Sequence, residues 1–158
     1  MDLKSMERAV ELDQVSLLDA AHEGEHSLEV HLPFLQVALG DFSLVPLVVG
    51  EASPEEVAEV LKLLWGGDET LIVVSSDLSH YLPYDKAQEL DEVTARAIQE
   101  LRPEALGRDQ ACGRMPVAGL LLRAREEGLS AECVDLRNSG DTAGPRNQVV
   151  GYGSFVFA

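Results

Sequence analysis

The chain has 158 residues, of which 46% are hydrophobic, and 28 acidic against 12 basic residues give it a formal net charge of −16. This length fits one domain with a core of its own, and the apolar runs are too short to span a membrane. The charge argues against nucleic acid and anionic lipid as partners, because binding to either needs clustered Lys and Arg. Acidic runs at 55–56 and 89–92 predict solvated helix faces. The first residues lack the apolar core of a signal peptide, so we expect a cytoplasmic location.

The first part of the chain predicts two helices and two strands. Apolar residues at helical spacing predict a short helix over residues 3–10, and residues 15–18 fit a strand. Leucines spaced by four, three and four positions over residues 28–39 predict a second helix, which Pro33 either kinks or delays. Residues 43–49 are typical of a strand.

The next helix has the clearest start signal in the chain. Ser53 fits the N-cap, Pro54 the first turn and Glu56 the closing residue of a capping box, and glycines at 66–67 end the helical pattern. Residues 71–74 (Leu-Ile-Val-Val) follow, and this run predicts a buried strand of a parallel sheet.

The second part of the chain predicts two helices followed by two strands. The helices are expected over residues 85–101 and 112–127, and the strands over 131–136 and 149–157, the last of them half exposed. The order of elements predicts an α/β fold with a mixed sheet flanked by helices on both faces. No linker or repeat interrupts the chain, so we expect a single domain over residues 1–158.

The residues that follow the apolar run at 71–74 carry the strongest chemical signal. Asp77 and His80 lie three positions apart in a polar turn, where ligands bind in open α/β sheets. A carboxylate beside an imidazole raises its basicity and fixes its tautomer, as an acid/base group or a metal ligand requires. The structural alternative is that Asp77 caps the turn and His80 packs under Tyr81.

A second signal is Cys112, which precedes a predicted helix and has Arg114 close by. The free N–H groups of the helix start and the positive charge favour a thiolate, which serves as a nucleophile or a soft metal ligand. A buried structural cysteine is an equal alternative, and Arg114 pairs with an acid, binds an anion or has a surface role. Cys133 lies in a predicted strand of alternating polar and apolar residues, so we expect it to be a small buried hydrophobic residue.

Two other groups carry weaker signals. Three of the four histidines lie at residues 22, 26 and 31, a spacing that fits a helical zinc site poorly and favours helix capping instead. Asp141 lies in a loop rich in turn-forming residues, so a turn-stabilising role is the first interpretation and a site-lining role the second.

Taken together, these motifs resemble the Memo-like family, protein B of the AmmeMemoRadiSam group. The matching segments are residues 25–35, 75–81 and 112–116, supported by 140–142 and 150–154. The family is similar in fold to class III extradiol dioxygenases, and its members have a pocket for iron or copper formed by two histidines from the N-terminal half and one cysteine.

The resemblance implies a role for each of the candidate residues. Cys112 corresponds to the ligand cysteine, and Asp77 and His80 line the same pocket, with His80 at the position of the dioxygenase acid/base histidine. We therefore expect Cys112 and His80 as metal ligands, Asp77 and His80 as the catalytic pair, and His26 and Arg114 as cofactor-binding residues.

The resemblance covers the C-terminal portion of the family pattern, so we expect a domain that lacks the N-terminal portion and, with it, both family histidines. The metal site is then partial unless His26 and His31 replace them. A sheet without its first strands exposes an unpaired edge and apolar surface, which predicts a homo-oligomer or pairing with an N-terminal half.

Three functions follow from these expectations. The first is a metal-dependent redox, dioxygenase-like enzyme or its remnant, acting on a small planar substrate. The second is a non-catalytic module that binds a small molecule or a peptide, and the third is half of a split protein. Stoichiometric iron or copper on the isolated chain would separate the first from the second.

Overall fold

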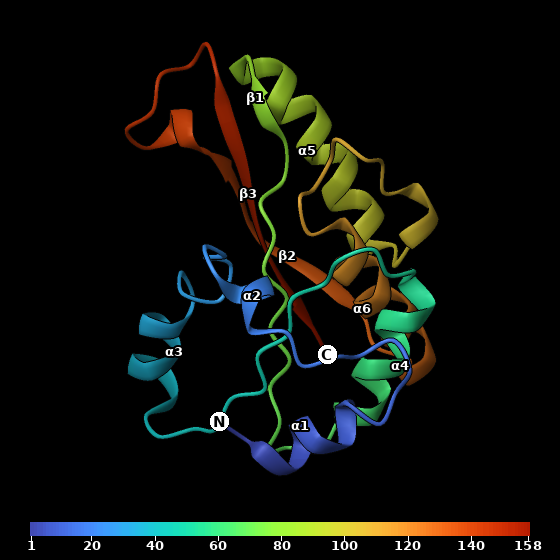
Figure 1. Ribbon diagram of the computed structural model, residues 1–158. Coiled ribbons are helices and arrows are strands. Elements are labelled where there is room, and N and C mark those ends of the chain that lie inside the picture. The colour runs from blue at the N-terminus through green and yellow to red at the C-terminus, as the bar shows by residue number, and fades with distance from the viewer.

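The computed structural model describes residues 1–158 and contains six helices, three strands and two 3-10 turns (Figure 1). The helices are α1 (Leu3–Ala9), α2 (Asp19–His22), α3 (Leu32–Leu39), α4 (Pro54–Leu64), α5 (Tyr84–Gln99) and α6 (Arg114–Glu127). The strands are β1 (His80–Leu82), β2 (Ala131–Asn138) and β3 (Val149–Phe157), and the 3-10 turns are η1 (Pro103–Ala105) and η2 (Ser139–Asp141).

The sheet is small, and every pair of neighbouring strands in it is antiparallel. β3 lies in the centre, with β1 on one side and β2 on the other. The long ladder runs from the Ala131–Phe157 pair to the Asn138–Gly151 pair. β1 is a short strand in which His80 pairs with Val150. The fold is therefore α/β, as predicted, but the expected mixed sheet with parallel strands is not found.

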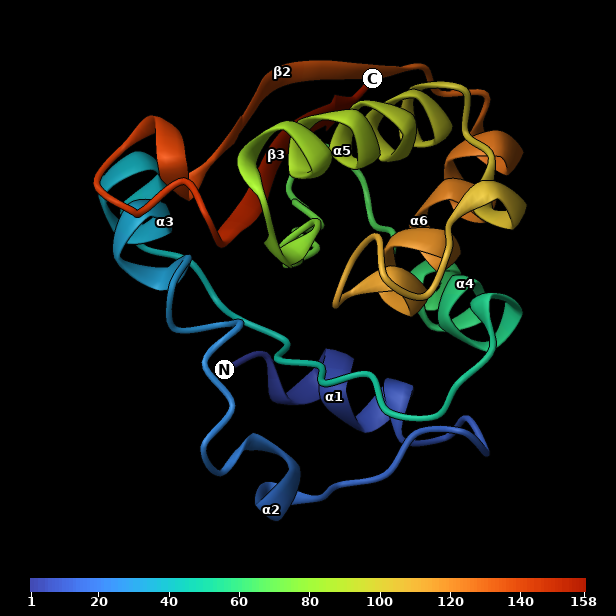
Figure 2. The same ribbon diagram turned by 90° about the horizontal axis from the view of Figure 1, so that it is seen from above.

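Helices α5 and α6 cover one face of the sheet (Figure 2). The core between them consists of small and medium apolar side chains from both helices, packed against Phe155 and Phe157 of β3. The alternate residues of β3 face the other way, and Tyr152 and Val156 there are 40% and 53% exposed. The half-exposed strand is confirmed, whereas the expectation of helices on both faces is wrong.

Helix α4 packs against α6 through a second apolar cluster. Val57 and Leu61 of α4 meet Leu120 of α6. The two helices approach closely because Gly119 has no side chain: a Cβ there would lie 2.4 Å from Cγ1 of Val57. α4 starts with the predicted capping box, in which Ser53 Oγ accepts a hydrogen bond from the Glu56 N–H and the Glu56 carboxylate accepts one from the Ser53 N–H.

Three predicted strands do not form. Residues 15–18, 43–49 and 71–74 lack strand pairing, and no backbone hydrogen bond joins the second of these segments to the third. A strand needs a neighbour to pair its N–H and C=O groups, and the only backbone hydrogen bond to these segments from a distant part of the chain runs from the Asp2 N–H to the Leu44 carbonyl oxygen. Leu71 and Val73 are 63% and 45% exposed, so the run predicted as a buried strand is an extended segment with one uncovered side.

The remaining predictions of secondary structure are confirmed. α1, α5, α6, β2 and β3 lie within two residues of their predicted limits, and α3 begins next to the proline at position 33, where the sequence allowed it to begin.

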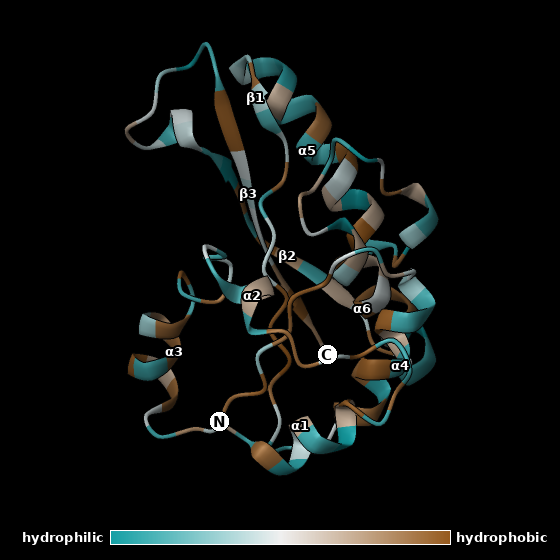
Figure 3. Ribbon diagram, viewed as in Figure 1, coloured by the Kyte–Doolittle hydropathy of each residue, from teal (hydrophilic) through white to brown (hydrophobic).

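The hydrophobic colour of Figure 3 continues beyond the helices along the extended segments in the centre of the view. None of the helices combines the length and the apolar character that a membrane crossing requires.

Candidate metal centre

Three of the predicted site residues converge on one exposed place next to the sheet. One ligand atom from each of Asp77, His80 and Cys112 lies within 4.8 Å of the other two. Asp77 lies in the turn that leads into β1, His80 ends that turn as the first residue of β1, and Cys112 lies just before α6. His80 Nε2 and Asp77 Oδ2 are 3.7 Å apart, an ion-pair contact if the imidazole is protonated.

Reciprocal hydrogen bonds join the segment of Cys112 to the turn. The Asp77 N–H donates to Cys112 Sγ at 3.2 Å, and the Cys112 N–H donates to the Asp77 carbonyl oxygen at 3.3 Å. The Gly113 N–H donates to Ser76 Oγ at 2.9 Å. A Cβ at Gly113 would lie 2.6 Å from the Ser75 carbonyl oxygen, so this close approach needs glycine. The sulfur is thereby kept beside Asp77.

A buried carboxylate lies beneath the turn. Asp91 of α5 is 2% exposed and accepts hydrogen bonds from the N–H and the hydroxyl of Ser79. Burial raises the pKa of Asp91, and the Ser79 hydrogen bonds and the charge of nearby His80 oppose that rise.

The sequence prediction missed Asp91. Residues 89–92 were expected to form a solvated face, and for Asp91 that expectation is wrong. A signal was available: Asp91 lies four residues from both Ala87 and Ala95, on the face of α5 that is buried.

The cluster is open to solvent on its outer side. Asp77 and His80 side chains are 50% and 34% exposed, and Cys112 is an exposed free thiol. The alternative of a buried structural cysteine at position 112 is therefore wrong. Tyr81 follows the cluster with a backbone φ of 58° and a side chain that is 70% exposed. A positive φ at a bulky residue is strained, and such strain concentrates at functional sites.

The two residues predicted to bind a cofactor lie outside this cluster. His26 is exposed in the turn before α3, where its N–H donates to Glu25 Oε1. Arg114 is the first residue of α6, two positions after Cys112, and makes no ion pair. Their role as cofactor-binding residues stays a prediction.

The two remaining candidates have structural surroundings. Cys133 lies half-buried in β2, and burial raises the pKa of its thiol. Asp141 stabilises a turn, as predicted first: its carboxylate accepts hydrogen bonds from the Tyr84 hydroxyl at 2.5 Å and from the Asn138 N–H at 2.9 Å. These two hydrogen bonds hold the pKa of Asp141 below its ordinary value, and the bond from the Tyr84 hydroxyl has the largest effect.

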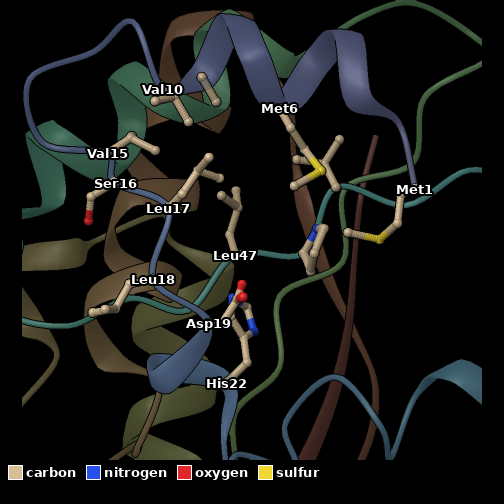
Figure 4. A pocket seen from close by; sticks show the side chains of 13 residues that line it. Met1, Met6, Val10, Val15, Ser16, Leu17, Leu18, Asp19, His22 and Leu47 are labelled. Atoms are coloured by element: carbon tan, nitrogen blue, oxygen red, sulfur yellow. The ribbon is translucent and has the colours of Figure 1, made fainter.

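A cavity lies away from the metal cluster, between α1, α2 and the extended segment 45–47. It has a volume of about 390 Å³ and a mostly apolar lining. Figure 4 shows Met6 of α1 and Val10, which follows α1, on one side of it and Asp19 and His22 of α2 on the other. None of the three residues of the metal cluster lines this cavity.

The chain matches known proteins along almost its whole length. The family model described as Memo-like protein matches residues 1–156. A MEMO1 family protein from Archaeoglobus fulgidus is 37% identical over 150 residues, which cover 88% of this chain and 57% of the relative. Another from Sulfolobus acidocaldarius is 36% identical over 169 residues, covering 99% of this chain and 58% of the relative. The chain spans just over half the length of these relatives.

Proposed function

Because the chain belongs to the Memo-like family, we propose that its cluster of Asp77, His80 and Cys112 binds a transition-metal ion as part of a metal-dependent redox site. The observation that carries the proposal is the convergence of a carboxylate, an imidazole and a thiol within 4.8 Å. Three protein ligands with an open fourth position are the arrangement of catalytic rather than structural metal sites.

The donor atoms favour iron, copper or zinc over magnesium and calcium. Thiolate sulfur is a soft ligand and imidazole nitrogen suits transition metals, whereas Mg²⁺ and Ca²⁺ take oxygen ligands. The exposed side of the cluster leaves room for a substrate or water. A bound iron or copper ion would supply Lewis-acid and redox chemistry at this place.

The residues of the chain supply proton chemistry and orientation. Asp77 Oδ2 lies 3.7 Å from His80 Nε2, so the carboxylate and the imidazole face the same exposed place. We propose that His80 binds the ion when metal is present, and that in the metal-free chain it is the group of the cluster that exchanges a proton with a substrate. We further propose that the whole protein carries out a dioxygenase-like reaction on a small planar substrate. This chain spans just over half the length of its relatives, so it would hold part of that site.

Metal analysis with matched cysteine variants tests the proposal. The purified chain is loaded with iron or copper, desalted and assayed for metal, alongside Cys112→Ala and Cys133→Ala. We expect about one ion per chain in wild type and Cys133→Ala, and a large loss in Cys112→Ala, because only Cys112 belongs to the cluster. No metal above background in wild type, or equal metal in the two variants, would contradict it.

We also propose that a polypeptide equivalent to the unmatched portion of the relatives covers the apolar surface around α3. Phe34 and Val37 are three residues apart on α3, and their side chains are 75% and 89% exposed. α3 has no buried residue and stands at the edge of the molecule (Figure 1). The extended segments 43–49 and 71–74 supply unpaired backbone groups that an added strand would pair.

Light scattering of the chain, alone and mixed with the unmatched portion of the Archaeoglobus fulgidus relative, tests this second proposal. We expect a complex with one copy of each polypeptide, formed at the expense of any self-association. A dimer of the chain that persists unchanged after the addition would assign the surface to a second copy and overturn the proposal.

A further inference from the structure

We propose that Asp91 is the positioning residue of the metal cluster, and that it holds the turn that carries Asp77 and His80 without binding the ion. The inference rests on the metal site proposed above and extends it to a residue beneath that site.

The contacts of Asp91 are directed at one residue of the turn. Its Oδ1 accepts the Ser79 N–H at 2.9 Å, and its Oδ2 accepts the Ser79 hydroxyl at 3.1 Å. Ser79 is fully buried, directly precedes His80 and follows Asp77 by two positions. Two hydrogen bonds to one residue fix both its position and its rotation, so Asp91 sets where its neighbours in the turn point.

Strand β3 holds the same turn from the sheet side. The Leu78 N–H donates to the Gly151 carbonyl oxygen, and the Gly151 N–H donates to the Ser79 carbonyl oxygen, each at 2.8 Å. A Cβ at position 151 would lie 2.0 Å from Asp91 Oδ2, so the glycine leaves the space that the carboxylate occupies. β3 and α5 therefore fix the turn jointly.

The stability of α5 does not account for a carboxylate at this position. Ala87 and Ala95, one turn away on either side, are 0% and 4% exposed, so an apolar residue would suit this face. Burying a carboxylate costs free energy unless hydrogen bonds compensate for the lost water. The only hydrogen bonds of the Asp91 side chain go to Ser79, which assigns its role to the turn.

Cobalt binding by four variants of the chain tests the inference. Co²⁺ is titrated into wild type, Asp91→Ala, Asp91→Asn and Glu92→Ala, and binding is followed by the absorption of the cobalt–thiolate bond. Glu92 is the control, because it is the exposed neighbour of Asp91 with the same charge. Folding of each metal-free variant is checked by circular dichroism and thermal unfolding.

We expect Asp91→Ala to weaken Co²⁺ binding by about 10–100-fold and to shift the cobalt spectrum, the effect of losing a group that orients a ligand. Asp91→Asn should keep most of the affinity, because its amide can still accept the Ser79 N–H. Glu92→Ala should behave as wild type. A folded Asp91→Ala variant with wild-type affinity and spectrum would overturn the inference.

Two further measurements decide the remaining cases. If Asp91→Ala does not fold, Ser79→Ala removes the hydroxyl contact alone: weaker Co²⁺ binding than in Glu92→Ala supports the inference, and unchanged binding and spectrum overturn it. If wild type binds no cobalt, the proposed metal site fails by itself. The rate at which iodoacetamide alkylates Cys112 then shows whether the turn has moved, because the Asp77 N–H of the turn donates a hydrogen bond to the Cys112 sulfur. A changed rate in Ser79→Ala supports the inference, and an unchanged rate overturns it.

Discussion

At the scale of single residues, the site depends on three close approaches that a sequence does not display. Gly113 lets the start of α6 meet the turn, Gly151 makes room for Asp91, and Ser79 connects Asp91 to the turn. Each residue is unremarkable by itself in the sequence. Their importance follows from atoms that lie far away along the chain and close in space.

Gly151→Ala tests the space beside Asp91. The added Cβ would lie 2.0 Å from Asp91 Oδ2, so the carboxylate or the strand must move. We expect a loss of about 1–3 kcal/mol in the free energy of unfolding, the usual cost of an overpacked interior. Gly50→Ala is the control, because nothing lies within 4 Å of its Cβ position. Urea unfolding measures both, and equal stability of the two variants would show that Gly151 leaves room to spare.

Asp141 gives a prediction about pH. The Tyr84 hydroxyl and the Asn138 N–H hold the folded-state pKa of Asp141 below its ordinary value of 3.8. Its contribution to stability is therefore complete above that value and is lost as the pH falls through the lower, folded-state pKa. Asp141→Asn should be destabilised relative to wild type at pH 6, with a difference that shrinks on acidification. Urea unfolding at several pH values measures this, and a difference that grows toward low pH would contradict it.

At the scale of elements, local signals predicted the helices well and the sheet poorly. The capping box at Ser53 and the apolar spacing of α5 are complete within one stretch of sequence. The run at 71–74 has the composition of a buried strand, but pairing depends on a neighbour that the run itself cannot specify. A segment that has the composition of a strand but no strand beside it to pair with therefore stays extended and unpaired.

The candidate site follows the same division. Asp77, His80 and Cys112 were singled out by residue type and by position at element ends, and the structure brings them together. Asp91 was missed because its acidic neighbours suggested a solvated face. Recognising it needed the helical register of α5 in addition to its composition.

Ser53→Ala tests the start of α4. The variant removes the hydroxyl that accepts the Glu56 N–H and so leaves one N–H of the first turn unpaired. We expect a loss of about 1 kcal/mol in the free energy of unfolding. Ser43→Ala is the control, because Ser43 is exposed and makes no hydrogen bond. Chemical denaturation of both variants measures the difference, and an equal effect would argue against the cap.

At the scale of the whole molecule, the apolar surface is unevenly distributed. The sheet face under α5 and α6 is well covered, whereas α3 and the extended segment at 71–73 expose large apolar side chains. Exposed apolar side chains of this size are the basis of the proposal above that another polypeptide covers the surface around α3. The distribution agrees with a chain that spans just over half the length of its relatives.

A double substitution on α3 tests whether this surface is available in solution. Phe34→Ser with Val37→Ser removes two of the most exposed apolar side chains. We expect weaker fluorescence of a hydrophobic dye and less self-association at high concentration. Val93→Ser is the control, because Val93 is 53% exposed on a different helix, α5. Dye fluorescence that falls equally in the control would show that α3 binds the dye no better than other exposed apolar side chains.

X-ray absorption by the zinc-loaded chain tests the proposed metal cluster most directly. Zinc is the probe, since its bonds to sulfur have a length of about 2.3 Å and are easily told from its bonds to nitrogen and oxygen, at about 2.0–2.2 Å. We predict one sulfur neighbour in wild type and in Cys133→Ser, and none in Cys112→Ser, with nitrogen and oxygen neighbours from His80 and Asp77. A wild-type spectrum without sulfur, or a sulfur signal that persists in Cys112→Ser, would contradict the account.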